Sequence, residues 1–479
     1  MPQLKQSNYI SKYTVPFIPI LVMIAITNFS AQMNTTAISI LLPVFMDEFQ
    51  ADIILVQWVV TAYILATCII ALVVGYISDR ISVKKTFLIA ASGFGLCTLF
   101  LGFASNIYSL IAMRIMQGIF GGMLMPLTQS MIYRYFPLEK QAKAISIWAT
   151  TNLIAPTIAP SIAGAIEDTL SWRYIFFFVA PIIFIVIAIA TKLLPARPPL
   201  EKTTQHKFDF SGLILSVIGS VSLLLAFSNI TVWGMLSFPV LALIVIGLLT
   251  MGLFFFVESK KEFPLLHVKV FSYKGFLSSV IVLCVGSTLI HSSNNIIPVF
   301  LQDIRGFTTT KSALIFLPAP LTIMFIVPML GKYYNRIGPQ KMLYTILSCG
   351  IVACITLGMI NLESSVFFII IALILRDIGA GTLNMPATNM GMQSIPIEYI
   401  THAAAVTSWA RQCVTSLSIG LAQTFQKSRT EYYMDEIHNV PNELLYKMSY
   451  CSAMSDLFHL IILCFFTGIL AVYFSKQKI

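Results

Sequence analysis

Long apolar runs recur along the whole chain, and each is about as long as the core of a membrane is thick. A membrane-spanning helix needs about 20 mostly apolar residues. Only 10% of the residues are charged, whereas a soluble globular protein carries about 25%. We therefore expect an all-α integral membrane protein with fourteen transmembrane helices. The predicted spans are 15–43, 55–77, 86–104, 108–132, 142–166, 173–194, 210–230, 237–257, 275–300, 312–333, 341–360, 365–391, 402–424 and 456–474.

The distribution of charge predicts how these spans are oriented. An even number of spans places both termini on one side of the membrane. When the termini and alternate loops are assigned to the cytoplasm, most Lys and Arg residues fall on that side, as the positive-inside rule requires. The weakest span, 402–424, contains Arg411, and parity supports it. The net charge is +10, but the basic residues are scattered over short loops. This distribution indicates the topology of the spans and does not indicate a nucleic-acid partner.

Internal repetition divides the spans into two halves. The segment Pro43–Asp47 recurs at Pro298–Asp303, and Arg114 recurs as Arg376. The longest cytoplasmic loops flank the spans between 210 and 257, which predicts an inserted two-helix hairpin. Parallel six-helix halves with a binding site at their interface are a transporter architecture. The predicted divisions are an N-terminal six-helix half at 1–194, linkers with the hairpin at 195–274, and a C-terminal six-helix half at 275–479.

A short charged turn joins the second and third spans. It resembles the loop signature of the major facilitator superfamily, Gly-x-Leu-Ala-Asp-Arg-x-Gly-Arg-Lys, although Ser82 and Val83 replace a Gly and an Arg. A degenerate copy lies at 331–341. The matching positions are Gly75, Asp79, Arg80 and Lys84 in the first copy and Gly331 and Arg336 in the second.

Charges in so short a turn cannot move independently of its helices. They can pair with a neighbouring helix end in one state and separate from it in another. We therefore expect Asp79 and Arg80 to form part of a cytoplasmic gate. The alternative is that the charged residues of the turn only set topology, as Lys84 and Lys85 already do.

Arg114 lies inside the fourth span, where an arginine costs about 2.5–3.5 kcal/mol at the membrane midplane and so usually has a use. Gln117 and the GxxxG pair Gly118 and Gly122 lie on the same helical face. The surrounding stretch is similar to the fourth-helix motif of the superfamily, whose Arg the resemblance implicates in proton coupling. The alternative is an arginine that holds helices together or reaches toward the membrane surface.

The fifth span contains small residues and two prolines that interrupt the helix hydrogen bonds. It resembles the antiporter motif Gly-x3-Gly-Pro-x2-Gly-Gly, with alanines in place of three glycines, at Ala155, Pro156, Ala159, Pro160 and Gly164. Further matches identify the drug:H⁺ antiporter branch with fourteen spans. These lie at 172–176, 208–212, Leu301-Gln302 and Arg411-Gln412.

The first span departs from that branch at the position that usually carries an acid. Asn34 stands in place of the expected Asp and cannot titrate. Two other residues could carry the proton. Asp377 is predicted near the midplane, with Arg376 expected to point about 100° away around the helix. His291 titrates near physiological pH but could equally be a hydrogen-bonded structural residue. A structural role for Asp377 as partner of Arg376 or Arg411 is the competing interpretation.

Polar and aromatic residues within the spans are candidates for the wall of a substrate cavity. They are Asn34, Gln117, Met33, Trp58, Trp148, Asn294 and Arg411. With 12% aromatic residues in the chain, most aromatic side chains must face lipid or pack between helices. The eight cysteines, mostly within apolar runs, form neither a disulfide pattern nor a metal motif.

No nucleotide-binding loop, zinc spacing, nucleophile elbow or carboxylate pair is present in the sequence. We therefore expect no enzyme, no cofactor and no metal. The favoured function is proton-coupled export of amphipathic toxic compounds by alternating access, as a monomer in a prokaryotic plasma membrane. Its partners are small-molecule substrates, protons and the lipid bilayer. Two alternatives remain open, an exporter of one endogenous metabolite and a non-transporting membrane sensor.

Overall fold

The computed structural model describes residues 16–195, 209–261, 264–436 and 441–475, apart from some side chains within these ranges, and contains no strand there. The first part of the chain forms α2 (Phe17–Ile40), α3 (Leu42–Phe49), α4 (Ile53–Ile81), α5 (Val83–Leu101), α6 (Ile107–Tyr135), α7 (Leu138–Thr169) and α8 (Arg173–Leu193). The hairpin of α9 (Phe210–Trp233) and α10 (Phe238–Lys260) and the short helix η1 (Val268–Ser272) follow.

The remainder of the chain repeats the long helices with more interruptions. It comprises α11 (Lys274–Val299), the π-helical η2 (Phe300–Ile304), α12 (Thr309–Phe316), α13 (Pro318–Ile337), α14 (Pro339–Gly358), α15 (Val366–Ala380), η3 (Gly381–Leu383), α16 (Asn384–Gln393), η4 (Ile397–Tyr399), α17 (Ile400–Glu436) and α18 (Asn442–Phe474). The predicted span 365–391 is therefore two helices joined by a tighter turn.

Polar side chains mark where the long helices begin. Asn106 and Ser109 form a reciprocal capping box at the start of α6, which satisfies two backbone donors that no intrahelical acceptor can reach. Asp52 accepts a hydrogen bond from the backbone of Leu55 at the start of α4. Between such caps the helix satisfies its own backbone, which a membrane interior demands.

Among the described residues, twelve helices are long and apolar enough to cross a membrane. Two further helices, α7 and α17, lie at the other two predicted spans, so every predicted span contains a helix. The crossing of the membrane by α7 and α17, and hence the count of fourteen, stays a prediction. The orientation of the termini in the membrane also stays a prediction. Residues 1–15 and 476–479 lie outside the described part of the chain.

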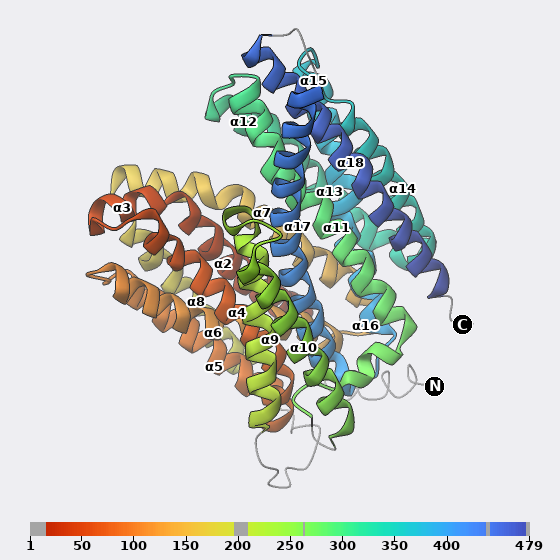
Figure 1. Ribbon diagram of the computed structural model, residues 1–479. Helices are drawn as coiled ribbons and strands as arrows, with labels where there is room; N and C mark the ends of the chain where they lie inside the picture. The colour runs from red at the N-terminus through yellow and green to blue at the C-terminus, as the bar shows by residue number, and fades with distance from the viewer. Residues whose placement is uncertain (1–15, 196–208, 262–263, 437–440, 476–479) are drawn as a thin grey trace. The chain divides into compact units, whose positions relative to one another are not determined.

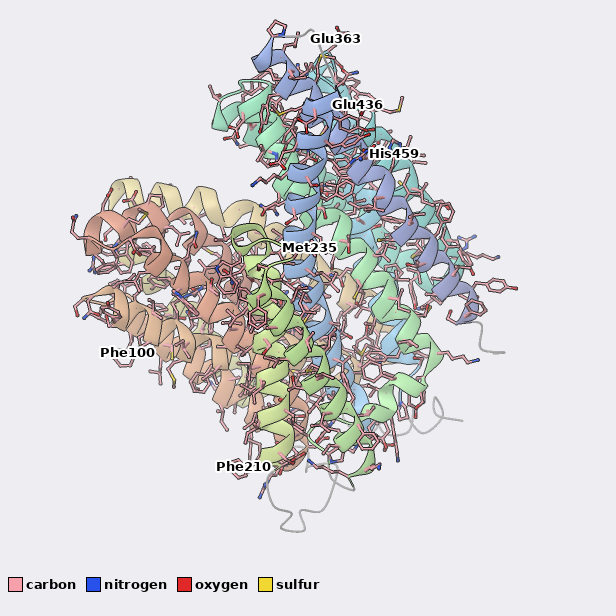
Figure 2. All side chains as sticks on the ribbon, in the orientation of Figure 1. Phe100, Phe210, Met235, Glu363, Glu436 and His459 are labelled. Carbon is pink, nitrogen blue, oxygen red and sulfur yellow. The ribbon has the colours of Figure 1, made fainter. Side chains whose placement is uncertain are left out.

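Apolar side chains project outward along the helices (Figure 2), as they must in lipid. Phe100 is 55% exposed and Phe210 is 66% exposed. The α9–α10 hairpin is closely packed, because a Cβ added to Gly247 would lie 2.7 Å from the Leu223 side chain. The two helices lie side by side in Figure 1.

The helices form two compact units. The first contains residues 1–221, 250–270 and 395–409, and the second contains 222–249, 271–394 and 410–479. In the first unit α4 packs on α6, and both α2 and α5 pack on α8. In the second unit α13 packs on α15, and both α11 and α14 pack on α18. The same pairing in the same order gives the internal repeat a structural counterpart. The division at residues 194 and 274 stays a prediction.

The segment 425–455, which the predicted spans 402–424 and 456–474 leave as a long loop between them, is mostly helical. Helix α17 continues to Glu436 and α18 begins at Asn442. Arg429 forms an ion pair with Asp456 at 2.5 Å, and Tyr433 donates a hydrogen bond to the same carboxylate. The expectation of a loop was wrong because the end of an apolar run does not end a helix, and a charged helix tolerates contact with water as well as a loop does.

Candidate functional site

The charged turn between α4 and α5 consists of one residue, Ser82, with φ 90° and ψ 149°. Gly338 joins α13 to α14 with φ 84° and ψ 148°. Glycine adopts this region freely, whereas other residues store about 1–3 kcal/mol of strain there. The two turns are therefore the same structural joint, and the serine in the first copy holds a conformation suited to glycine.

Asp79, in the last turn of α4, joins this turn to the beginning of α17. Its Oδ2 accepts a hydrogen bond from His402 Nε2 at 2.8 Å, and its Oδ1 lies 3.7 Å from Arg134 Nη2. Arg134 also donates a hydrogen bond to Thr401 Oγ1 at 2.9 Å. All four residues belong to the first unit. Gly75 makes this approach possible, because a Cβ there would lie 2.5 Å from the His402 ring.

The other charges of the turn lie elsewhere. Arg80 is exposed and donates a hydrogen bond to Tyr76 one helical turn away. Lys84 donates to the carbonyl oxygens of Thr191 and Leu194 at 2.8 and 2.6 Å, where a cation is favoured by the carboxyl end of α8. Of the two residues expected in the gate, Asp79 therefore bonds to a distant part of the chain, whereas the hydrogen bond of Arg80 is local. In the second copy Gly331 is buried and Arg336 is exposed.

Arg114 is completely buried in α6 and held by neutral groups. Its Nε donates to the carbonyl oxygen of Val59 at 3.1 Å, and its Nη1 donates to Asn34 Oδ1 at 3.2 Å and Gln117 Oε1 at 2.5 Å. The guanidinium carbon lies 4.0 Å from the centre of the Tyr63 ring. None of the ion pairs between described residues includes Arg114.

Arg376, its counterpart in α15, is held by a carboxylate. Its Nη2 lies 2.6 Å from Asp377 Oδ1, and its Nε donates to the same oxygen at 2.8 Å. The expectation that the two side chains diverge was wrong, because the long arginine side chain curls back to its neighbour. Nη1 of Arg376 donates to Asn294 Oδ1 at 2.8 Å and to Ser293 Oγ at 3.1 Å. The competing structural interpretation of Asp377 thus has a direct contact behind it.

Each buried arginine donates to an asparagine on an equivalent helix of its own unit. Asn34 lies on α2 and Asn294 on α11. His291 lies one helical turn before Asn294. It is close enough to Arg411 and Arg376 to interact electrostatically with both positive charges. His291, Asn294, Arg376, Asp377 and Arg411 therefore lie in one region of the second unit, with Asp377 as the acid among them, whereas Gly331 and Arg336 are not part of this group.

The remaining predicted residues divide into buried and exposed ones. Met33 is 9% exposed, and Trp148 is buried with its Nε1 donating to Thr128 Oγ1 at 3.2 Å. Trp58 is 41% exposed, which suits lipid or an open cavity better than a packed core. Gln117 donates to Thr98 Oγ1 at 2.8 Å and supports Arg114 from behind.

The predicted antiporter stretch lies within α7. Ala155 and Ala159 are completely buried, and Pro156 is partly buried. A Cβ added to Gly164 would meet no atom of the described residues within 4 Å, so no close packing among them depends on that glycine. The side chain of Pro160 lies outside the described part of the structure.

A seam of amides between α2 and α7 was not predicted. Asn28 Nδ2 donates to Asn152 Oδ1 at 2.9 Å and to Thr151 Oγ1 at 2.7 Å, and Gln32 donates to the same Asn152 oxygen at 3.2 Å. Amides in apolar spans are expensive unless paired. Their presence at 28, 32 and 152 was the signal that could have found this seam.

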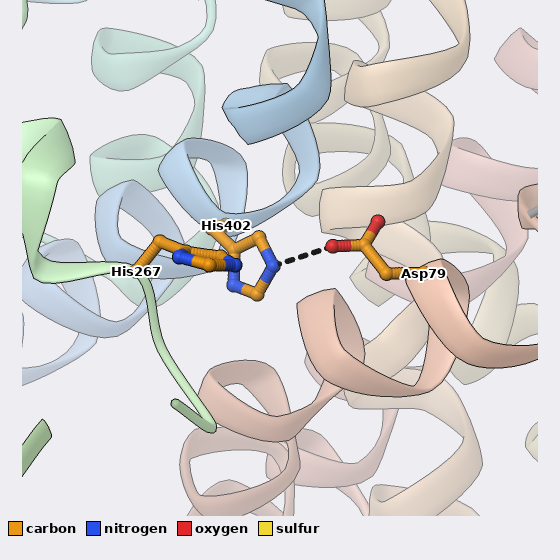
Figure 3. Close-up of side chains that lie close together, drawn as sticks. All are labelled: Asp79, His267 and His402. Atoms are coloured by element: carbon orange, nitrogen blue, oxygen red, sulfur yellow. Dashed lines mark hydrogen bonds and ion pairs between the residues drawn. The ribbon is translucent and has the colours of Figure 1, made fainter. Parts of the chain in front are cut away.

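His267, in the connection between α10 and η1, was also not predicted as a site residue. Its ring centre lies 4.7 Å from that of His402 and 5.0 Å from that of Tyr399. Burial and the neighbouring His402 lower the pKa of His267 to about 4, so its imidazole is neutral near pH 7. Figure 3 shows His267, His402 and Asp79 side by side.

The ends of the inserted hairpin are tied together by charge. Lys261 Nζ lies 2.5 Å from Asp209 Oδ1 and 3.2 Å from Glu258 Oε1. The backbone N–H of Gly212 donates to the same Asp209 oxygen at 2.8 Å. Burial raises the pKa of Asp209, but hydrogen bonds with Glu258, Lys261 and Gly212 outweigh burial and hold that pKa below its usual range. The described part of the motif, 209–212, therefore has a structural role at the start of α9.

Comparison with known proteins gives consistent matches across the chain. A family model described as the Major Facilitator Superfamily matches residues 24–419. The lincomycin resistance protein LmrB of Listeria monocytogenes is 25% identical over 461 residues, covering 96% of this chain and 97% of that protein. The multidrug export protein EmrB of Escherichia coli is 23% identical, with 85% and 80% covered. The crystal structure of the human organic anion transporter MFSD10 superposes with a TM-score of 0.65 at 13% identity, covering 94% of this chain and 100% of that one.

Proposed function

Because this chain belongs to the major facilitator superfamily, we propose that it is a proton-coupled exporter of amphipathic toxic compounds that works by alternating access. It is a multi-pass transporter of the plasma membrane and not an enzyme. Resistance to lincomycin and multidrug export are named for two relatives, which supports drug-like substrates for this chain.

The observation that carries the proposal is the state of Arg114. A membrane-embedded arginine costs about 2.5–3.5 kcal/mol, and this one is completely buried with neutral partners only among the described ion pairs and hydrogen bonds. One terminal nitrogen, Nη2, has no hydrogen-bond partner among the described residues. The Arg114 guanidinium is therefore a buried positive charge with an unused hydrogen-bond donor. Such a group is suited to transient binding of a transported molecule or to interaction with a titrating group.

Asn34 cannot carry the proton, so another acid must. We propose Asp377, since it is the acid beside the second buried arginine. In this proposal protonation of Asp377 releases Arg376, and deprotonation restores the pair. One proton moving through 100 mV supplies about 2.3 kcal/mol. Since about 1.4 kcal/mol corresponds to a tenfold ratio, that is enough to concentrate a neutral compound tens of fold.

The proposal is tested by dye efflux from proteoliposomes with an imposed proton gradient, with and without an uncoupler. We expect efflux by the wild type that stops when the uncoupler is added. Arg114→Lys should retain part of this activity, whereas Arg114→Ala should lose it, because lysine preserves the positive charge. Activity of Arg114→Ala equal to the wild type at matched reconstitution would remove the coupling role.

The same assay separates the alternatives. Uncoupler-sensitive flux of any compound excludes a non-transporting sensor. A panel of chemically unrelated dyes distinguishes a multidrug exporter, which moves several of them, from an exporter of one endogenous metabolite, which moves few or none.

A further inference from the structure

We propose that Asp79, His267 and His402 form a binding site for a divalent transition-metal ion, with Zn²⁺ preferred. One donor atom from each residue lies within 4.8 Å of the other two. The three residues come from α4, the connection before η1, and the first turn of α17, and all three belong to the first unit (Figure 3). The sequence showed no zinc spacing, because residues this far apart in the chain leave no local pattern.

The donor set decides the kind of metal. Two imidazoles and one carboxylate suit Zn²⁺ better than Mg²⁺ or Ca²⁺, which prefer oxygen ligands. Zinc ligands lie about 2.0–2.2 Å from the ion, so tetrahedral ligands are about 3.3 Å apart. Donor atoms spread over at most 4.8 Å therefore need to shift by about 1–1.5 Å. Three protein ligands leave a fourth position for water or another group.

The surroundings contain unused hydrogen-bonding capacity. His402 is 1% exposed, and its Nδ1 has no hydrogen-bond partner among the described residues. A buried ring nitrogen without a hydrogen-bond partner is costly. Coordination of a metal ion would give the His402 ring an additional partner. Arg134, 3.7 Å from Asp79, opposes a cation here. We therefore expect micromolar affinity and not the much tighter binding of closed structural zinc sites.

A bound ion would join segments that are distant in sequence. Asp79 and His402 are 323 positions apart. Helix α17 begins in the first unit and continues into the second at residue 410. Fixing its first turn to the end of α4 should hold the protein in one state, so Zn²⁺ should inhibit transport. This last step rests on the proposed export function, whereas metal binding does not.

Binding is tested on the purified full chain in detergent, with any affinity tag removed, by calorimetric titration with Zn²⁺ and metal analysis after gel filtration. We expect one ion per chain, with no competition from Mg²⁺. His267→Gln should weaken binding at least tenfold, and His267→Cys should retain it because a thiolate is also a zinc ligand. His459→Gln, which changes an exposed histidine on α18, is the matched control and should bind as the wild type does.

Zinc binding by His267→Gln equal to that of the wild type, or no binding by the wild type at micromolar Zn²⁺, would overturn the proposal. His267 lies outside the helices, so we expect its substitution to leave the fold intact. It therefore tests the metal site even if a substitution of His402 prevents folding.

Inhibition is measured as the dye-efflux rate with Zn²⁺ divided by the rate of the same variant without it. We expect this ratio to fall severalfold for the wild type and for His459→Gln, and to stay near one for His267→Gln. An unchanged ratio in the wild type, together with measured binding, would refute inhibition and leave the metal site standing. If the chain exports nothing, efflux is absent without Zn²⁺ as well, and the binding result is unaffected.

Discussion

Arg114 donates a hydrogen bond to the side-chain oxygen of Asn34 at 3.2 Å, at the position where related transporters are expected to carry an acid. The amide nitrogen of the same Asn34 is buried without a hydrogen-bond partner among the described residues. In the second unit the equivalent Arg376 has both an asparagine and the carboxylate of Asp377. The first arginine therefore has the same neutral partner as the second but lacks its counter-charge.

The first prediction is that Asn34→Asp stabilises the protein by about 1–2 kcal/mol. It replaces a neutral acceptor with a charged one beside Arg114 and removes the unpaired amide nitrogen. The measurement is thermal unfolding followed with a thiol-reactive probe, since five of the eight cysteines are buried and three are partly buried. Asn294→Asp is the matched control and should gain less, because Arg376 already pairs with Asp377. An equal gain in both variants would show that the missing counter-charge is not the cause.

The second prediction concerns the two equivalent turns. Ser82→Gly should stabilise the protein by about 1 kcal/mol. Glycine relieves backbone strain of about 1–3 kcal/mol at φ 90°, and part of this gain is offset because the Ser82 side chain no longer caps α5. The reverse change, Gly338→Ser, should destabilise by a similar amount. Both are measured by the same thermal assay, and changes of the same sign in the two variants would contradict it.

The helices and the repeat could be predicted from the sequence because apolar length and spacing are local properties. The contacts that matter most could not. Asp79 meets His402 across 323 positions, and nothing in either neighbourhood specifies the other. Arg376 was expected to point away from Asp377, yet the two side chains form an ion pair. Backbone geometry fixes the direction in which a side chain leaves the helix, and it does not fix where the end of a long side chain lies. Segment 425–455 was expected as a loop because it lies between two apolar runs, and apolar length alone does not show where a helix ends.

The third prediction distinguishes the two charges expected in the gate. Asp79→Asn should abolish transport while drug binding is retained, because it weakens the contacts to His402 and Arg134. Arg80→Gln, which removes an exposed side chain whose hydrogen bond to Tyr76 is local, should keep most activity. Transport and binding are measured in proteoliposomes and detergent respectively. Normal export by Asp79→Asn would leave topology as the remaining role of the turn.

The fourth prediction is that Asp377 carries the coupled proton. Asp377→Asn should retain drug binding but lose drug-dependent proton movement, which is followed with a pH-sensitive dye inside proteoliposomes. Asp377→Glu should recover part of it, because a carboxylate is restored.

The same substitution also leaves Arg376 with neutral partners only among its described contacts, and breaking a buried pair costs about 3–5 kcal/mol. The double variant Arg376→Gln with Asp377→Asn separates the two effects, since it removes both charges and keeps hydrogen-bonding groups. If Asp377 is the coupling acid, the double variant should be as stable as the wild type or nearly so and still move no protons. If Asp377 only neutralises Arg376, the double variant should recover proton-coupled export, and the proton must then be carried by another group.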